Sequence, residues 1–128
     1  MSIQKKYSAI HVRNIDLWAH VGVLDKERLN GQQFLLDVSI WLDIEAAEKG
    51  DDVGLSKDYS LIIKSIQKLS FQINCKTIEV YSEKILDAIE VLCGQIPVKI
   101  ILQKCSPPVD GFTGYVSIER HRYFQLLK

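Results

Sequence analysis

One stretch decides the fold of this chain: Phe34-Leu35-Leu36-Asp37-Val38-Ser39-Ile40-Trp41-Leu42-Asp43-Ile44. Its even-numbered residues are all apolar, whereas its odd-numbered residues mix charged, polar and apolar side chains. Successive side chains of a β-strand point to opposite faces, so this alternation predicts a long strand that is buried on one face. The other face is only half suited to water, because it carries Leu35 and Trp41 beside two aspartates.

The same period of two recurs in three other segments on either side of this stretch. We predict strands from about Tyr7 to Val23, from Val98 to Gln103, and from about Gly114 to His121. In the last of these strands, Val116 and Ile118 are expected to face the core.

Between these strands the period of the apolar residues changes to that of a helix. A first stripe has the spacing i, i+4, i+7, i+11, and its members are Ile62, Ile66, Leu69 and Ile73. A second stripe follows and consists of Ile78, Tyr81, Ile85, Ile89 and Leu92. Asp58 and Thr77 suit the N-cap positions of these two helices, and Gly94 suits the end of the second.

The order strand, strand, helix, helix, strand, strand predicts an α+β domain. We expect a four-stranded antiparallel sheet with both helices on one face, in the order ββααββ. Four strands cannot close on themselves, so two sheet edges stay unpaired within the chain. A protein commonly pairs such an edge with another subunit, which predicts a ring-shaped homo-oligomer. A monomer with charged or bulged edges is the alternative that topology leaves open.

Length and composition limit the possible functions. The chain has 128 residues, which predicts a single domain over residues 1–128. Lys plus Arg (16) equals Asp plus Glu (16), and this balance argues against a nucleic-acid partner. No apolar run approaches the roughly 20 residues that a membrane helix needs, and no signal peptide is visible. Three cysteines without a C-x-x-C pair predict reduced thiols and a cytoplasmic location.

Two charged residues, Lys104 and Glu79, are candidates for a functional site. Lys104 has the parity of the apolar residues of its strand, and burial lowers the pKa of a lysine, which suits acid–base chemistry. A lysine that reaches into solvent at a strand end is the alternative. Glu79 lies in the first turn of the second helix, where the helix dipole favours an anion. At a pocket, such a carboxylate can also accept two parallel N–H bonds from a guanidine-like edge.

Three further features give weaker signals by themselves. Glu27 lies in the polar connection Asp25-Lys26-Glu27-Arg28, where a solvated loop charge is the simplest interpretation. Tyr59 begins the first helix, where a half-buried aromatic side chain usually serves packing. The pair Asp51-Asp52 indicates a cation site only weakly, and the three histidines lack the spacing of metal ligands.

The segments that contain these residues resemble the dihydroneopterin aldolase family in order and spacing, from about Ile10 to Arg120. The matching segments are Gly22-Val23-Leu24-Asp25-Lys26-Glu27-Arg28 with Gly31-Gln32, Ala46-Ala47 with Asp51-Asp52, Asp58-Tyr59, Ile78-Glu79, and Lys104-Cys105-Ser106-Pro107-Pro108.

The resemblance implies the tunnelling fold, in which the sheets of several subunits join into a barrel. It implies a homo-octamer of two stacked tetramers, with sites at the subunit interfaces. The implied reaction belongs to folate synthesis and cleaves 7,8-dihydroneopterin into 6-hydroxymethyl-7,8-dihydropterin and glycolaldehyde. Because the dihydropterin ring already contains a C=N bond beside its side chain, the substrate can absorb the displaced electrons. No metal and no other cofactor is then expected.

Residue by residue, the resemblance implies a role for each matched position. Glu79 is the pterin anchor for the 2-amino group and N3, and Ile78 provides a backbone contact to the pterin. Lys104 is the general acid and base, and Glu27 works with it through an ordered water. Tyr59 comes from the neighbouring subunit and protonates or orients the reacting carbon.

The sequence departs from the family pattern at two places. After Glu79 the family usually has small apolar residues such as Leu-Ala, whereas this chain has Val80-Tyr81-Ser82. Before Tyr59 a Thr-Val pair is common in the family, whereas this chain has Ser56-Lys57. Neither change removes a named catalytic group, and their effect on the polarity of the pocket and on the rate is left open by the sequence.

Three other functions compete with the aldolase. A dihydroneopterin or dihydroneopterin triphosphate epimerase is the nearest rival, but Lys104 with Pro107-Pro108 favours the aldolase, and both activities can coexist. A non-catalytic pterin- or purine-binding module predicts the loss of Glu27 or Lys104, and both are present. The zinc-dependent synthases of the same fold are disfavoured because the histidine cluster is missing.

Overall fold

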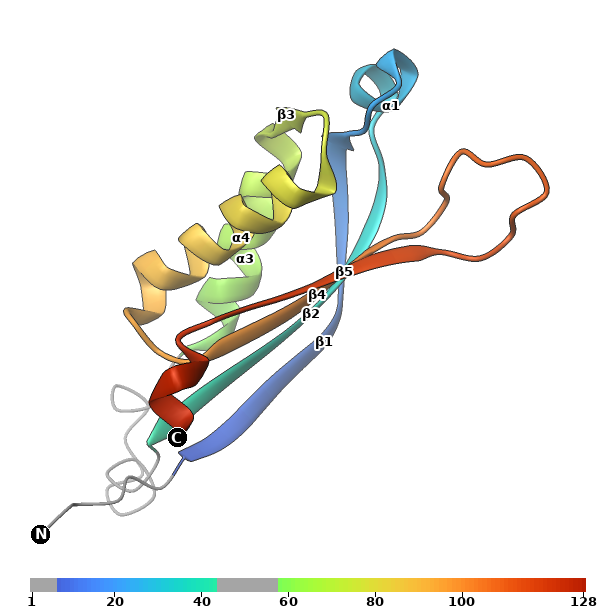
Figure 1. Cartoon of the computed structure of the whole chain (residues 1–128). Coiled ribbons are helices and arrows are strands. Elements are labelled where there is room, and N and C mark those ends of the chain that lie inside the picture. The colour runs from blue at the N-terminus through green and yellow to red at the C-terminus, as the bar shows by residue number, and fades with distance from the viewer. Residues whose placement is uncertain (1–6, 44–57) are drawn as a thin grey trace, which may run out of the picture.

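The computed structural model describes residues 7–43 and 58–128, which fold around one curled sheet (Figure 1). Four of its strands are long, and each is antiparallel to the long strand or strands beside it: β1 (Tyr7–Val21), β2 (Gln32–Asp43), β4 (Val98–Lys104) and β5 (Val116–Arg122). A fifth strand, β3 (Asn74–Cys75), runs parallel to the end of β1. The sheet order is β3-β1-β2-β4-β5, so the α+β class is confirmed and the sheet is mixed.

The prediction of a purely antiparallel, four-stranded sheet was therefore wrong in one respect. β3 has only two residues, which is too short to show any period in the sequence. It pairs with His20 and Val21, and the amide of Gly22 donates a further hydrogen bond to the carbonyl of Cys75 at 3.0 Å. This short strand ties the end of β1 to the chain that leads into the last long helix.

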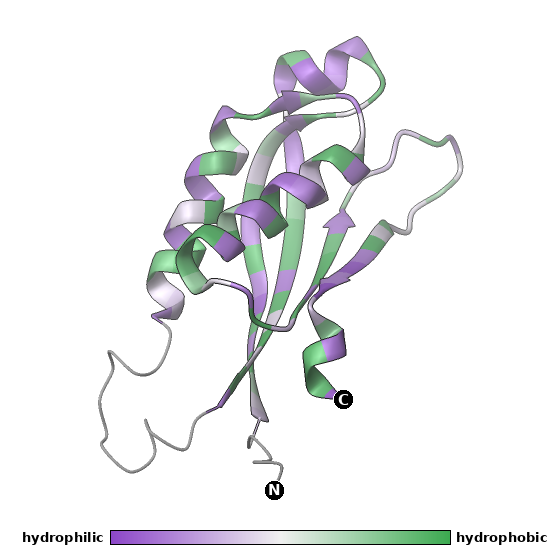
Figure 2. Ribbon diagram, turned by 60° about the vertical axis from the view of Figure 1, so that its left-hand side comes forward, coloured by the Kyte–Doolittle hydropathy of each residue, from purple (hydrophilic) through white to green (hydrophobic). Residues whose placement is uncertain are grey.

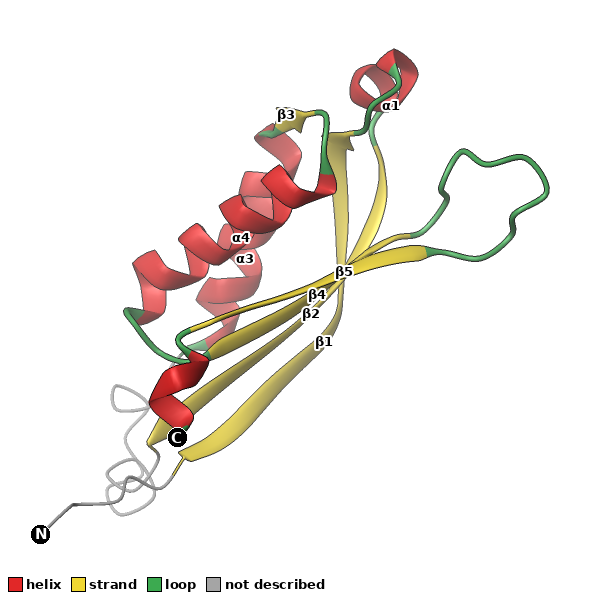
Figure 3. Ribbon diagram, viewed as in Figure 1, coloured by secondary structure: helices red, strands yellow, loops and turns green. Residues whose placement is uncertain are grey.

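Two long helices, α3 (Tyr59–Gln72) and α4 (Ile78–Cys93), lie side by side on one face of the sheet (Figure 3). The predicted caps of both helices are confirmed. The Asp58 carboxylate accepts a hydrogen bond from the amide of Ser60 at 2.9 Å, and the Thr77 hydroxyl accepts one from Val80 at 3.2 Å. Gly94 follows α4 with a φ of 75°, a conformation that glycine adopts without steric cost.

The apolar face of β2 lies against these helices as predicted, and Phe34, Leu36, Val38, Ile40 and Leu42 are buried. Figure 2 shows the corresponding alternation of hydrophobic and hydrophilic residues along the strands. Ile44, which continues the pattern in the sequence, lies outside the described residues.

Two predicted core positions are exposed instead. Val116 is 48% exposed, and the buried stripe of α4 ends on Cys93 rather than on Leu92. The last strand begins at Val116 and not at about Gly114, so Val116 stands at a strand end beside a long loop. Ile118 packs against the core as expected.

A bulge in β1 changes which of its residues face the core. The register with β2 shifts between Val12 and Ile15, and Asn14 has a φ of 59°, which asparagine tolerates better than most residues. The amide of Asn14 donates a hydrogen bond to the carboxylate of Asp37 at 2.8 Å. After the bulge, odd-numbered residues face the core, and the strand reaches the end of the sheet with Val21 buried.

One end of the sheet gathers the segments that matter for the site. The short helix α1 (Asp25–Asn30) lies there together with β3, as Figure 1 shows, while the C-terminal 3-10 helix η2 (Phe124–Leu127) lies at the other end. The sequence predicted only a polar connection at residues 25–28, so α1 is a correction. No helix within residues 7–43 and 58–128 is long and apolar enough to cross a membrane.

A buried hydrogen bond between the two long helices is open to a direct test. Tyr81 is fully buried, and its hydroxyl donates to the hydroxyl of Ser70. We expect Tyr81→Phe to lower the free energy of unfolding by about 1–2 kcal/mol, because it leaves a buried hydroxyl without its partner. Denaturant unfolding at a fixed protein concentration measures the change. In a cycle with Ser70→Ala, a coupling energy near zero would show that the bond contributes nothing.

Candidate active site

A cavity of about 330 Å³ opens where the end of β1, the start of α4 and the end of β4 meet. Its volume lies at the lower end of the roughly 300–1,000 Å³ that small-molecule pockets occupy. The carboxylate-bearing Glu79 and the ammonium-bearing Lys104 both line it. Most of the remaining lining is apolar and includes Val21, Val23, Phe34, Ile78, Pro107, Pro108, Val109 and Val116. Such walls suit a flat heterocycle with a few polar groups.

Lys104 is the last residue of β4 and lies opposite Phe34 of β2. Its parity places the side chain on the same face as the fully buried Leu102, at the point where the core gives way to the cavity. The side chain is 18% exposed, and its Nζ lies 2.6 Å from Oε2 of Glu27. Lys104 therefore does not extend into solvent from the strand end.

Glu27 lies in α1 and is 8% exposed, so the interpretation as a solvated loop charge was wrong. Besides Lys104, its carboxylate accepts hydrogen bonds from Nε2 of Gln32 at 2.8 Å and from the amide of Leu24 at 3.1 Å. Burial opposes ionisation of this carboxyl group, but the three hydrogen bonds together outweigh it and hold the pKa of Glu27 below its usual range. The contact with Lys104 is direct, whereas the family resemblance implied one through water.

Gln32 and Arg28 support Glu27 and were not recognised as site residues in the sequence. The side-chain amide of Gln32 bonds the carbonyl of Val21 at 2.6 Å as well as the carboxylate of Glu27. The guanidinium of Arg28 donates to the carbonyls of Gly22 at 2.7 Å and Val23 at 2.8 Å. The signal available in the sequence was a polar residue, Gln32, at the start of a strand whose inward face is otherwise apolar.

Gly22 is needed for the close approach of Glu27. A Cβ atom at this position would lie 2.4 Å from Cδ and 2.5 Å from Cβ of Glu27, which is far inside van der Waals contact. Any side chain at residue 22 would therefore displace the carboxylate from Lys104.

Glu79 and Ile78 form the first turn of α4 at the rim of the cavity. Ile78 is partly buried against the core, and Glu79 is exposed in the single chain. Among the residues that the structure describes, no side chain bonds the carboxylate of Glu79, which leaves both of its oxygens available to a ligand. The structure thus places Glu79, Ile78 and Lys104 around one cavity, with Glu27 directly behind Lys104.

Tyr59 does not line this cavity. It is the first residue of α3 and is 57% exposed. The opposite end of α3, at Gln72, leads into β3 beside the site, and a helix of 14 residues spans about 21 Å. Tyr59 and Glu79 of one chain therefore lie at opposite ends of the helical layer, and a contribution of Tyr59 to the site of another subunit stays a prediction.

The departure Val80-Tyr81-Ser82 does not change the cavity. Tyr81 and Ser82 are fully buried, and the hydroxyl of Ser82 accepts a hydrogen bond from Arg120 at 3.1 Å. Val80 is 46% exposed and is absent from the cavity lining. The sequence left the effect of these residues on the pocket open, and the structure shows that the helix turns two of them toward the core and that none of the three lines the cavity. The other sequence features of this region, Ala46-Ala47, Asp51-Asp52 and Ser56-Lys57, lie outside the described residues.

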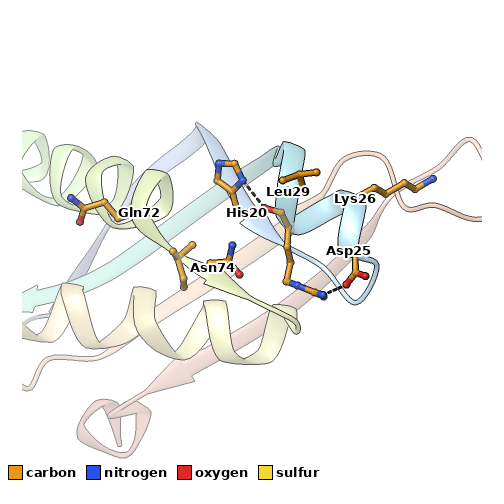
Figure 4. Close-up of a pocket in the computed structure, with 8 residues that line it drawn as sticks. His20, Asp25, Lys26, Leu29, Gln72 and Asn74 are labelled. Carbon is orange, nitrogen blue, oxygen red and sulfur yellow. Dashed lines mark hydrogen bonds and ion pairs between the residues drawn. The ribbon is translucent and has the colours of Figure 1, made fainter.

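A second, larger cavity of about 730 Å³ lies between α1 and the C-terminal end of α3 (Figure 4). Nδ1 of His20 contacts the carbonyl of Arg28 at 2.8 Å, and Arg28 pairs with Asp25. Lys26 extends away from the other labelled residues in Figure 4. This cavity contains none of the predicted site residues, so the smaller cavity is the better candidate. No group of three or more metal-ligating side chains occurs in residues 7–43 and 58–128.

The fold and the site together define a class of protein: a small α+β domain with an apolar cavity that holds a free carboxylate and an ion-paired lysine. The model of the FolB dihydroneopterin aldolase family matches residues 10–121, and the chain belongs to this family. A Synechocystis sp. protein named "Probable dihydroneopterin aldolase" is 34% identical over 110 residues, which cover 86% of this chain and 93% of the relative. Relatives of this name favour the aldolase over the epimerase.

Solved structures of similar proteins agree on the fold. The crystal structure of an E. coli dihydroneopterin aldolase in complex with neopterin matches with a TM-score of 0.80 and 20% identity, covering 90% of this chain and 98% of the other. A dihydroneopterin aldolase from Burkholderia thailendensis bound to guanine matches with a TM-score of 0.68 and 16% identity, covering 91% and 90% of the two chains. The joining of sheets from several subunits into a barrel stays a prediction.

The lowered pKa of Glu27 predicts how the stability of the protein depends on pH. A carboxyl group whose pKa is lower in the folded state stabilises the fold fully above its unfolded value of 4.5, and this stabilisation is lost as the pH falls through the folded-state value. The difference in free energy of unfolding between the wild type and Glu27→Gln should therefore be constant near neutrality and shrink below about pH 4.5. Unfolding curves of both proteins, recorded at intervals of about 1 pH unit between roughly pH 3 and pH 7, measure this difference in free energy of unfolding. A difference that grows on acidification would contradict the ion pair.

Proposed function

We propose that the chain is a dihydroneopterin aldolase, a carbon–carbon lyase of folate synthesis. Its substrate is 7,8-dihydroneopterin, and its products are 6-hydroxymethyl-7,8-dihydropterin and glycolaldehyde. The observation that carries the proposal is the buried ion pair of Glu27 and Lys104 at the wall of a cavity that also presents the free carboxylate of Glu79. Membership of the family and the names of its relatives support the same conclusion.

The proposed binding mode follows from the shapes and charges of the cavity. Glu79 accepts parallel hydrogen bonds from the 2-amino group and from N3–H of the pterin, with both carboxylate oxygens in use. The backbone at Ile78 contacts the same heterocycle, and the apolar walls cover its faces. Neopterin and guanine, the ligands of the two similar crystal structures, share this amino-oxo pyrimidine edge, which supports the assignment.

The reaction needs one proton removed and one proton delivered. A base takes the proton of the 2′-hydroxyl, the bond between C1′ and C2′ breaks, and C2′ leaves as the aldehyde carbon of glycolaldehyde. The electron pair flows from C1′ into the neighbouring C=N bond of the dihydropterin ring, and a proton is then delivered to C1′. Acid–base groups and a rigid clamp are therefore sufficient for the chemistry.

Lys104 is the proposed acid and base for both transfers. As a neutral amine it takes the proton of the 2′-hydroxyl, and as an ammonium it delivers a proton to C1′, while the carboxylate of Glu27 at 2.6 Å holds it in position. Glu27 is thus the proposed partner that orients the ammonium of Lys104. The hydrogen bonds from Gln32 and from the amide of Leu24 fix the carboxylate, so the pair stays aligned as the proton moves.

The complete site is proposed to need a second chain. We assign the protein as a homo-octamer of two stacked tetramers, with Tyr59 of one subunit completing the site of the next. Among the strands of residues 7–43 and 58–128, β5 lies at an edge of the sheet with no partner on its outer side, and Tyr59 is exposed in the single chain; both support this assignment. Tyr59 would then protonate or orient the reacting carbon.

The proposed activity can be tested directly. Purified protein incubated with 7,8-dihydroneopterin and EDTA should release 6-hydroxymethyl-7,8-dihydropterin and glycolaldehyde in equal amounts. Chromatography with fluorescence detection after oxidation measures the pterin, and the same run reveals any C2′ epimer. No product from correctly assembled protein would overturn the aldolase assignment, and an epimer as sole product would favour the epimerase.

Two variants separate binding from chemistry. Lys104→Ala should lower kcat by at least about 100-fold while guanine still binds, because acid–base catalysis contributes factors of roughly 10²–10⁴. Glu79→Ala should weaken guanine binding by about 10- to 100-fold, since it removes two charge-assisted hydrogen bonds. Steady-state kinetics and isothermal titration calorimetry provide the two readouts. Lys84→Ala, at an exposed position of α4 outside the cavity, is the matched control. An unchanged guanine affinity in Glu79→Ala would refute the anchor role.

A further inference from the structure

Of the charged side chains that line the cavity, only one has an ion-pair partner of opposite charge. Three of them line it, namely Lys76, Glu79 and Lys104. The charge of Lys104 is taken up by Glu27 at 2.6 Å. Within the part of the chain that the structure describes, neither the ammonium of Lys76 nor the carboxylate of Glu79 has a side-chain partner. The empty cavity thus offers a ligand one free anion and one free cation.

The backbone places these two residues close together at the start of α4. Lys76 follows β3, which is held against β1, and Glu79 lies in the first turn of α4. Between them Thr77 caps the helix through its hydrogen bond to the amide of Val80, and its carbonyl accepts a weak bond from the thiol of Cys75 at 3.6 Å. The turn that carries Lys76 and Glu79 is therefore fixed before any ligand arrives.

The ligand edge that Glu79 is proposed to bind has three polar groups in a row. The 2-amino group and N3–H are donors, and the 4-oxo oxygen beside them is an acceptor. A carboxylate matches the two donors but repels the oxygen, so the third position needs a donor. Glu79 supplies two acceptor oxygens, and Lys76, which lines the same cavity, supplies an ammonium donor.

We propose that Lys76 is a specificity-determining residue that donates a hydrogen bond to the 4-oxo oxygen of the bound heterocycle. This inference rests on the proposed binding of a pterin by Glu79. It makes the site selective for oxo-heterocycles over analogues whose oxygen is a poorer acceptor. Lys76 is exposed in the single chain, so the preference comes from the hydrogen bond that the oxygen accepts from a charged donor, which a poorer acceptor makes more weakly.

The backbone offers a competing donor for this oxygen. The first amides of a helix have no partner within the helix, and Ile78 and Glu79 occupy such positions at the rim of the cavity. The experiment must therefore distinguish the side chain of Lys76 from these amides, which every substitution at residue 76 retains.

The test compares guanine with 6-thioguanine, which has the same N–H donors but replaces the oxygen by sulfur, a weaker acceptor. Calorimetric titration of the full-length wild type should show a preference for guanine of about tenfold or more. Lys76→Met should lose most of this preference, mainly by weaker guanine binding, and Lys76→Arg should restore it. Lys84→Met is the matched control on the exposed side of α4 and should behave as the wild type.

Two results would overturn the inference. An unchanged preference in Lys76→Met would assign the oxygen to the backbone amides, and an equal loss for both ligands would show a general effect of charge instead of a contact with the oxygen. Neither ligand reacts, so these measurements do not depend on turnover. If Lys76 controls the preference while dihydroneopterin is not cleaved, the proposed function fails and the specificity role stands.

Discussion

The ion pair between Glu27 and Lys104 is the interaction on which the rest of the site depends. Two charges withdrawn from water are costly unless each is paired and its remaining polar atoms are bonded. The structure meets this condition, because the side chain of Gln32 and the amide of Leu24 donate hydrogen bonds to the carboxylate of Glu27 in addition to its contact with Lys104. The pair has room only because residue 22 is a glycine. A buried and fully bonded acid next to an amine is expensive to build, which supports the proposed acid–base role of the pair.

The sheet brings the partners of this pair together from distant parts of the chain. β2 pairs with β1 on one side and with β4 on the other, so the turn after β1 and the end of β4 meet at one end of the sheet. β3 adds the start of α4 to the same place through its pairing with β1. Arg28 holds the intervening turn by bonding the carbonyls of Gly22 and Val23. The free carboxylate of Glu79 and the ammonium of Lys104 thus face one cavity although each comes from a different element.

Particular elements show where prediction from the sequence succeeded and where it did not. The apolar side of β2 and the caps of α3 and α4 were predicted correctly, because periods and capping residues act over a few neighbouring positions. β3 was missed because two residues carry no period, and α1 because its polar composition is equally typical of a loop. The burial of Tyr81 was predicted by its place in the stripe of α4, but its effect on the pocket as a departure from the family could not be decided without the tertiary structure.

The sequence by itself determined the four long strands and the two long helices, most of the face that each buries, and, through the resemblance, the family and the candidate site residues. Only the tertiary structure decided that Glu27 is buried in a helix against Lys104, with Gln32 and Gly22 as its supports. The physical reason is that local composition cannot distinguish a solvated charge from a buried one. That distinction depends on partners that arrive from other strands, and on hydrogen bonds that exist only after the sheet has formed.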